Sequence, residues 1–220
     1  MKSIEELVGA ILDRRRTISP ARSLLVGLSG IDASGKGWLT DQLLARLALY
    51  SANAVKINVD GWLNLPHKRF GLNSTGLHFY ENAIRFEEFF AELIAPLRND
   101  GSIYLEADFT EETSSSYRKH TYDFKNVQII LVEGIFLFRS PYRTLFDLAV
   151  WVDCSFSTAL GRALKRGQEG LTAAQVIRAY ETIYFPAQRI HFERDKPRRN
   201  ADLVFDNDPF RAAIRKEPFP

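Results

Sequence analysis

The chain has very little cysteine and almost no excess charge of either sign. Its single cysteine, Cys154, has no second cysteine with which to form an internal disulfide, which excludes a disulfide-stabilised scaffold. The 29 Lys and Arg residues are nearly balanced by 27 Asp and Glu residues, and the formal net charge is +2. Such a balance gives no global field that would drive binding to nucleic acid or to a membrane. Any anion-binding site is therefore expected to be local.

Long hydrophobic runs are also missing. The longest nearly uncharged apolar stretch, residues 127–138, contains Glu133 and is much shorter than the ~20 residues of a membrane-spanning helix. The first residues, MKSIEELVGAILDRRR, carry acids and lack the apolar core of a signal peptide. These features predict a cytoplasmic protein with no membrane or nucleic-acid partner, and the stretch 127–138 is interpreted as a buried strand.

The rest of the sequence is typical of one domain over residues 1–220. At 220 residues and 45% apolar, the chain can bury one substantial core. Short apolar runs alternate with segments of helical periodicity, which predicts an α/β fold whose parallel sheet is covered by helices on both faces. The expected strands are 23–28, 54–60, 127–133, 148–153 and 201–206. The expected helices are 3–15, 38–50, 81–97 (ended by Pro96 and the Asn99-Asp100-Gly101 turn), 156–166 and 172–190, with a small β-hairpin arm at about 102–125.

A glycine-rich loop joins the first expected strand to the next helix. Its residues are Gly30, Ile31, Asp32, Ala33, Ser34, Gly35, Lys36 and Gly37. They match the pattern G-x-x-x-x-G-K in the strand-to-helix setting that a phosphate-binding loop requires. Backbone N–H groups and the positive end of the helix favour a polyphosphate, and Lys36 would reach its β- and γ-phosphates. The loop predicts an ATP site; the alternative is an ordinary glycine-rich turn.

One position of this loop departs from the pattern. Gly37 stands where a Ser or Thr hydroxyl normally binds Mg²⁺. Either the metal is held through water and carboxylates, or the metal-dependent chemistry is weakened. The candidates for holding the metal are Ser34, Asp32, Asp60 and Glu133.

Carboxylates stand at the ends of three other expected strands, as Asp60, Glu133 and Asp153, of which Asp153 is interpreted as a cap of the following helix. Because ligands of open α/β sheets lie beyond the carboxyl ends of the strands, these acids suggest a site. Glu133 is predicted to orient Mg²⁺, and Asp60 to be the general base that accepts the proton of an attacking hydroxyl. Asp108 is a further candidate for binding substrate hydroxyls. The alternative for Glu133 is a strand-end carboxylate whose hydrogen bonds are satisfied within the protein. The alternative for Asp60 is a cap on the turn before Gly61.

Two arginines lie four residues apart on an expected helix. The guanidinium groups of Arg162 and Arg166 would share one face, and Gly167 and Gly170 would allow a hinge. We predict a helical lid at about 156–171 that closes over ATP and neutralises charge on the transferred phosphoryl group. The alternative is a solvated charged face.

In their order along the chain, these elements resemble the uridine kinase and phosphoribulokinase family of P-loop kinases. The similar segments are GLSGIDASGK, the Asp60-Gly61-Trp62 strand end, FYENAIRFEEFFAELIAPLR, LVEGIFLF, LFDLAVWVD, the helix of Arg162 and Arg166, and ADLVFDN. The resemblance implies a P-loop NTPase-type parallel core, a hairpin arm beside the substrate, ATP and Mg²⁺ as cofactors, and frequent homo-oligomers. It also implies that Asp60 is the catalytic base, Lys36 the phosphate lysine, Glu133 the Mg²⁺-orienting acid, and the two arginines the lid residues.

The part of the sequence that faces the substrate in this family differs. Uridine kinases carry a Tyr-Asp-Tyr/Phe segment followed by His and Arg, where this chain has Asp108 and Phe109 but Ala107 for the first tyrosine and no aligned histidine. The predicted substrate-binding residues are Asp60, Trp62, Asp108 and Phe109. Three hypotheses stay open: a uridine/cytidine kinase-like enzyme acting on a 5′-hydroxyl, a kinase of a pantothenate- or sugar-like alcohol, and a catalytically weak nucleotide-binding relative.

Overall fold

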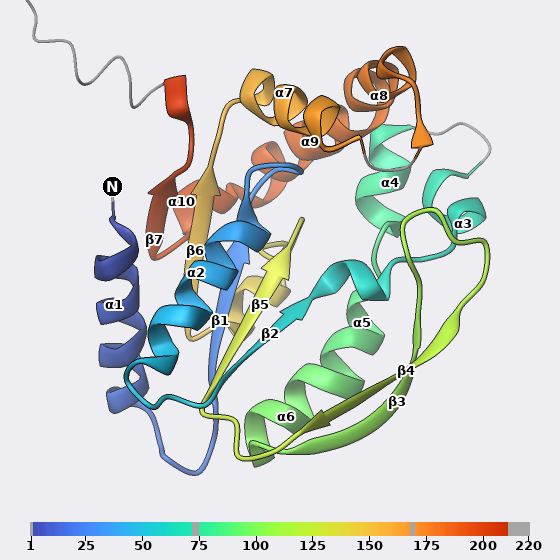
Figure 1. Ribbon diagram of the computed structural model, residues 1–220. Helices are drawn as coiled ribbons and strands as arrows, with labels where there is room; N and C mark the ends of the chain where they lie inside the picture. The colour runs from blue at the N-terminus through green and yellow to red at the C-terminus, as the bar shows by residue number, and fades with distance from the viewer. Residues whose placement is uncertain (1, 72–74, 168–169, 211–220) are drawn as a thin grey trace, which may run out of the picture.

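The computed structural model describes residues 2–71, 75–167 and 170–210 and is centred on a parallel sheet (Figure 1). The sheet has five strands in the order β2-β5-β1-β6-β7. They are β1 (Leu24–Ser29), β2 (Ala54–Asn58), β5 (Ile129–Gly134), β6 (Leu148–Asp153) and β7 (Leu203–Asp206). All neighbouring strands pair in parallel, with β1 in the middle. The α/β prediction is confirmed.

Helices cover both faces of the sheet. The three inner strands are therefore buried along their whole length. One face is covered by α1 (Ile4–Thr17) and α2 (Lys36–Ala48) (Figure 1). The opposite face is covered by α4 (Gly76–Asn82), α5 (Phe86–Glu88), η2 (Phe89–Ile94), α6 (Ala95–Asp100) and α9 (Phe185–Asp195). Successive strand residues point to opposite faces, so Leu24 packs with the first group and Leu25 with the second.

The helix expected over residues 81–97 differs from the structure. After α4 ends at Asn82, a separate helical run passes from α5 through the π-helical segment η2 into α6. Pro96 lies in the first turn of α6, so the prediction that it ends the helix is wrong. The π-helical segment shifts the hydrogen-bond pattern directly before the proline, and the missing N–H of Pro96 is tolerated there. Gly101 ends the run in the left-handed conformation, with a φ of 66°.

A two-stranded antiparallel arm stands beside the sheet, as predicted. It consists of β3 (Ile103–Phe109) and β4 (Arg118–Phe124), with Ala107 opposite His120. The arm is fixed to the turn η1 (Val59–Trp62), where the indole N–H of Trp62 donates to the Tyr122 hydroxyl over 3.0 Å. The arm is therefore held next to the carboxyl end of β2.

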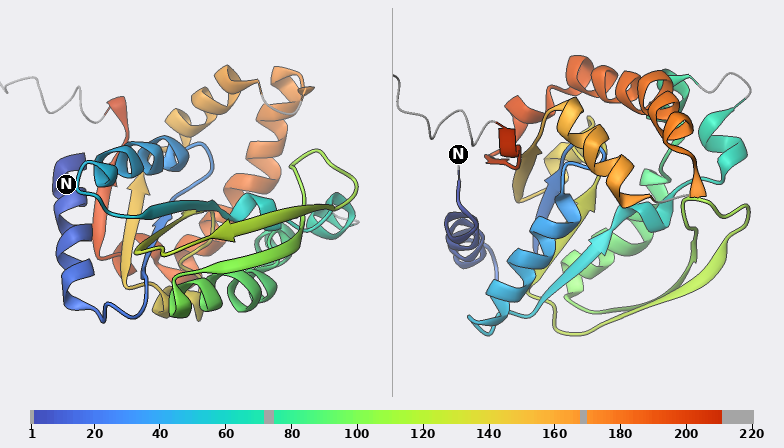
Figure 2. Two further views of the ribbon diagram at one scale, coloured as in Figure 1. Left: turned by 60° about the horizontal axis from the view of Figure 1, so that its bottom comes forward. Right: turned by 45° about the horizontal axis from the view of Figure 1, so that its top comes forward.

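The remaining elements lie mostly at the carboxyl ends of the strands. Figure 2 shows α7 and α8 above this end of the sheet, on the same side as the loop after β1. These elements are α3 (Pro66–Phe70), α7 (Phe156–Arg166), α8 (Ala173–Ala179) and the π-helical η5 (Tyr180–Tyr184), with η3 (Tyr142–Leu145) and α10 (Pro197–Asn200) elsewhere. Residues 168 and 169 of the expected lid lie outside the described residues. In the described part of the chain, no helix combines the length and apolar character of a membrane span.

Candidate active site

The loop between β1 and α2 depends on glycine at two close approaches. A Cβ atom on Gly30 would lie 2.5 Å from the carbonyl oxygen of Val152 on β6. Gly35 has a φ of 91°, and a Cβ there would lie 2.2 Å from the side-chain nitrogen of Asn207. Glycine is favoured at position 30 by the nearby backbone of β6 and at position 35 by the left-handed backbone conformation.

Lys36 lies at the first turn of α2 and crosses the loop. Its ammonium donates to the carbonyl oxygen of Ile31 over 2.9 Å, and the residue is only 7% exposed. The N–H groups of the 13-residue helix α2 point into the same space. Positive charge from two sources therefore converges on the loop, which is the arrangement that binds a polyphosphate.

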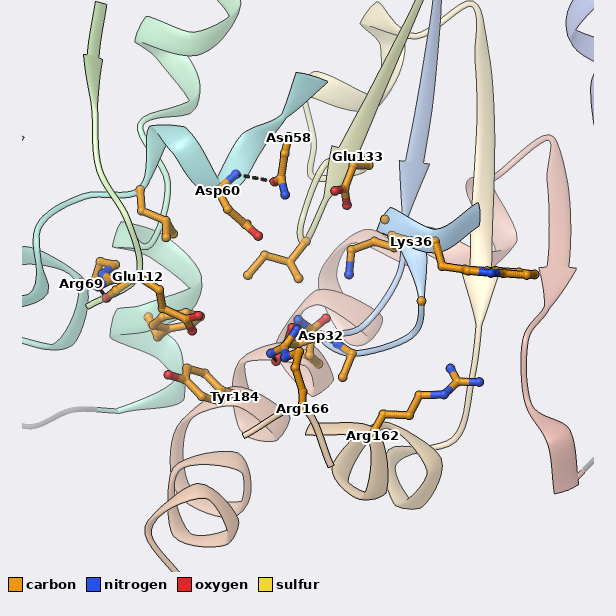
Figure 3. Close-up of a pocket in the computed structure, with 18 residues that line it drawn as sticks. Asp32, Lys36, Asn58, Asp60, Arg69, Glu112, Glu133, Arg162, Arg166 and Tyr184 are labelled. Atoms are coloured by element: carbon orange, nitrogen blue, oxygen red, sulfur yellow. Dashed lines mark hydrogen bonds and ion pairs between the residues drawn. The ribbon is translucent and has the colours of Figure 1, made fainter. Parts of the chain in front are cut away.

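A cavity of about 430 Å³ opens over the loop (Figure 3). Its charged lining comes from the loop, β2 with η1, β5 and α7, and includes Asp32, Lys36, Asp60, Glu133, Arg162 and Arg166. In Figure 3 the side chains of Lys36, Asp60 and Glu133 are directed toward one space. The structure thus brings together the principal predicted groups, although they are separated by up to about one hundred residues in the sequence.

Asp60 lies two residues beyond the end of β2, in η1. Its backbone N–H donates to the side-chain oxygen of Asn58 over 2.7 Å, which caps the turn and fixes the position of Asp60. The residue is exposed toward the cavity space that it borders. Desolvation by the protein around the cavity raises the pKa of Asp60, Lys36 opposes the rise, and the charge of Asp32 adds to it.

Glu133 is the penultimate residue of β5, lies opposite Asn58 and is 4% exposed. Burial, opposed by Lys36 and assisted by Asp60, raises the pKa of Glu133 to about 7. Among the described residues, no hydrogen bond to its carboxylate is found. A buried carboxylate that faces a phosphate site and lacks protein donors fits Mg²⁺, which is typically held by one or two carboxylates together with phosphate oxygens and water.

A second cavity of about 1010 Å³ lies between the arm and β2. Its aromatic wall is formed by Phe109, His120, Tyr122 and Phe124. The ring centroids of Phe109 and His120 are 5.0 Å apart, and those of His120 and Tyr122 are 4.6 Å apart. Asp60 lines this cavity as well as the first one, so its carboxylate lies where the two cavities meet.

The two predicted lid arginines both line the first cavity but have different partners. Arg162 donates to the backbone carbonyl oxygens of Ser34 (3.0 Å) and Asn207 (2.7 Å), so it holds the loop against β7. Arg166 lies 4.0 Å from the carboxylate of Asp32, on the rim of the loop. Figure 3 shows Arg162 and Arg166 extending in different directions. Their spacing predicted that both guanidinium groups would share one face of the helix, but the two groups contact different parts of the loop.

Three other predicted residues lie away from the cavity walls. The Ser34 side chain is fully buried beneath the loop, and its role as a metal ligand stays a prediction. Trp62 is also fully buried and supports Tyr122, which does line the second cavity. Asp108 forms an ion pair with Lys119 at 2.9 Å on the surface of the arm. Of the arm residues predicted to bind substrate, Phe109 is the one that faces a cavity.

The sequence analysis did not identify Arg69, which lines the first cavity, or Tyr180, which contacts the phosphate loop. Arg69 on α3 is 2% exposed and donates to the backbone carbonyl oxygen of Glu112, which itself borders both cavities. The Tyr180 hydroxyl donates to the carboxylate of Asp32 and ties η5 to the phosphate loop. Arg69 belongs to a basic trio in an aperiodic segment, which was a weak signal. Nothing in the spacing around Tyr180 distinguishes it from a core residue.

No protein-family model matches the chain. A uridine kinase of Macrococcus caseolyticus (strain JCSC5402) is 27% identical over 191 residues, which cover 84% of this chain and 88% of the relative. A solved Bacillus stearothermophilus protein, described as a possible uridine kinase, matches with a TM-score of 0.73 and 24% identity, over 92% of this chain and 97% of its own. A Silicibacter sp. TM1040 protein named for a fructose transport system kinase has a TM-score of 0.75 and 19% identity, over 93% of this chain and 100% of its own.

Proposed function

We propose, on the premise that this chain belongs with the uridine kinase-like P-loop kinases, that it transfers the γ-phosphate of ATP to a hydroxyl group of a small molecule. The observation that carries the proposal is the position of Asp60. Its carboxylate faces Lys36 and Glu133 in the loop cavity and the aromatic wall in the arm cavity. A base at this junction lies between a phosphate donor in one cavity and an acceptor in the other.

Each group then has a defined task in the transfer. The ATP phosphates lie in the loop, where the ammonium of Lys36 exchanges the Ile31 carbonyl for phosphate oxygens. Asp60 accepts the proton of the attacking hydroxyl while the new O–P bond forms and the bond to the departing ADP oxygen breaks. Its raised pKa makes Asp60 a stronger base than an ordinary aspartate. Arg166, released from Asp32, stabilises the charge on the transferred group.

Mg²⁺ belongs to this proposal as the ion bound to the nucleotide phosphates near Glu133. When bound, it would neutralise charge on the phosphate oxygens. Glu133 would hold the ion directly or through water, and no cluster of three metal-binding side chains is found in the described residues. A single carboxylate with phosphate and water ligands is consistent with that finding.

A nucleoside is the first acceptor that we propose, with the 5′-hydroxyl as the reacting group. The rings of Phe109, His120 and Tyr122, in tilted and edge-on contact with one another, offer an aromatic surface against which a planar base can pack. The relative from M. caseolyticus is a uridine kinase, in agreement with this choice. Although no histidine aligns in β3, His120 reaches the wall from the opposite strand of the arm.

A small alcohol that carries an anionic group is the second candidate. The buried guanidinium of Arg69 lines the cavity that also holds Asp60 and suits a carboxylate or phosphate. Pantothenate and sugar acids or phosphates meet this description. A cytoplasmic location and self-association are parts of the same proposal, to be checked by cell fractionation and analytical ultracentrifugation.

The decisive experiment is a measurement of ADP release with Mg·ATP and a panel of alcohols. The panel contains uridine, cytidine, pantothenate, fructose and glycerate, each compared with a reaction that lacks an acceptor. We expect one class to increase ADP release well above this background. Absence of any increase, with protein that is folded and binds ADP, would contradict the kinase proposal. Thermal shifts with uridine or with an acidic alcohol then distinguish the two acceptors.

A further inference from the structure

The last residue of the phosphate loop faces two charged groups. A Cβ atom added to Gly37 would lie 3.4 Å from Oε1 of Glu133 and 3.8 Å from Nζ of Lys56. A serine would therefore fit at this position in ordinary van der Waals contact. Its hydroxyl would point into a space bordered by a carboxylate and by an ammonium group.

The ammonium of Lys56 is held at this place by the first turns of α2. It donates to the carbonyl oxygen of Gly37 over 3.4 Å and to the Asp41 carboxylate over 2.7 Å. Lys56 lies two residues before Asn58 on β2, and Asn58 is the register partner of Glu133 on β5. Strand geometry places Lys56 and Asn58 on the same face of the sheet. The lysine therefore reaches Gly37 from the strand next to Glu133.

Position 37 and Lys56 thus act on the same small region. In the usual loop, the residue after the lysine supplies a neutral hydroxyl ligand to Mg²⁺. Here the chain supplies no ligand at position 37 and brings a positive charge to its edge. A divalent cation at Glu133 is repelled by that charge, whereas nucleotide phosphates are attracted to it. Asp41 offsets part of the charge but is itself exposed, with 61% of its side chain accessible.

We propose that Lys56 and Gly37 together set the metal affinity of the nucleotide site, with the Lys56 ammonium weakening the binding of a divalent cation beside Glu133. This inference rests on the nucleotide site of the proposed function but not on any particular acceptor. Lys56 is a positioning and charge-setting residue, not a catalytic one. If Lys56 were only a structural bridge between β2 and α2, its removal would leave the metal affinity unchanged. The fold would also be little affected, because exposed ion pairs contribute little to stability.

The test measures Mn²⁺ binding to the ADP-saturated protein by electron paramagnetic resonance of the free ion. Binding of ADP in EDTA is measured first by calorimetry, for wild type and for Lys56→Met, Gly37→Ser and the double variant. We expect Lys56→Met to tighten Mn²⁺ binding about ten-fold, because a like charge is removed. Gly37→Ser should tighten binding only slightly while Lys56 is present. The double variant should bind Mn²⁺ more tightly than the product of the two single effects.

The control is Lys2→Met, which removes a lysine that lies just before α1, is ion-paired with Glu6 and is far from the site. It lowers the net charge by the same amount and should leave Mn²⁺ affinity unchanged. Lys56→Gln repeats the measurement if the methionine variant unfolds. Unchanged or weaker Mn²⁺ binding in the folded lysine variants would overturn the inference and leave the kinase proposal standing. Failure of wild-type protein to bind ADP would overturn both.

Discussion

The single residue with the greatest influence on the proposed chemistry is Asp60. Its location in η1, and not within β2, allows its carboxylate to border both cavities. The change from Asp60 to Asn keeps the side-chain shape but removes the base. We expect a loss of about 100-fold or more in kcat, the usual scale for a general base, with ADP affinity within a few-fold of wild type.

The control for this variant is Asp123→Asn, which alters an acid in the wall of the arm cavity. Turnover within a few-fold of wild type in Asp60→Asn would remove Asp60 from the role of base. The raised pKa of Asp60 also predicts the pH dependence. As the pH falls, kcat/KM should begin to decline at a higher pH than it would with an ordinary aspartate, whose pKa is 3.8. Protonated Asp60 cannot accept the proton, so the activity is lost on the acid side.

Trp38 offers a direct optical measure of nucleotide binding. Of the three tryptophans, Trp62 and Trp151 are buried, whereas Trp38 is 50% exposed and lines the loop cavity two residues after Lys36. A nucleotide in the loop changes the surroundings of this indole alone. We predict that ADP alters the emission of the wild type and that Trp38→Phe abolishes the change while calorimetry still detects binding. An equal change in both proteins would contradict this placement.

At the scale of elements, the N-terminus of α7 depends on an acid from the segment after β7. Asp208 accepts hydrogen bonds from the Ser155 N–H and the Thr158 hydroxyl, both at 2.9 Å. Burial alone would raise the pKa of Asp208, but these hydrogen bonds outweigh it and lower the pKa to about 2. The contact therefore stabilises the start of the helix that carries Arg162 and Arg166.

This coupling predicts how stability depends on pH. Because the folded pKa of Asp208 is below the ordinary 3.8, its contribution is present above that pH and is lost as the pH falls toward 2. Asp208→Asn should lower the free energy of unfolding by about 2 kcal/mol at pH 7, and the difference should shrink between pH 4 and 2. Urea unfolding at several pH values measures it. A difference that stays constant down to pH 2 would mean that the charge of Asp208 is not responsible.

The helices also show where predictions from local sequence rules were wrong about helix boundaries. The run from α5 to α6 continues past Pro96 because a π-helical segment precedes it, and the break falls earlier, after α4. By contrast, the start of α8 follows a local rule, because Thr172 and Gln175 form a capping box there. A helix cap depends on residues only three positions apart in the sequence. The break between α4 and α5 depends instead on how both helices pack against one face of the sheet.

At the scale of the whole molecule, the sheet, the arm, α7, η5 and α9 all contribute residues to the walls of the two cavities. A ligand that joins these parts stabilises the folded state by mass action. ADP at about 100 times its Kd should contribute about 2.7 kcal/mol, and for a chain of this size should raise Tm by roughly 5–10 °C. Differential scanning fluorimetry gives the shift. Lys36→Met is the matched variant, and an equal shift in that protein would show that ADP binds outside the loop.

The sequence by itself determined the features that depend on neighbours along the chain. The glycine loop, the buried strands and the strand-end acids Asp60 and Glu133 are local patterns, because strand and helix periods and glycine-dependent turns are fixed by backbone geometry. Even the hairpin arm could be predicted, since its strands are close in sequence. These features were enough to indicate a phosphate site and the α/β fold.

Only the tertiary structure decided which side chains meet. Asp60 lies at the junction of two cavities, Trp62 turns inward to hold Tyr122, and Arg162 holds the loop backbone. Lys56 on β2 reaches Gly37 in the first turn of α2. These contacts join residues that are about twenty to more than one hundred positions apart, and each depends on sheet order and packing. No spacing rule carries that information, because many strand orders are compatible with the same local pattern.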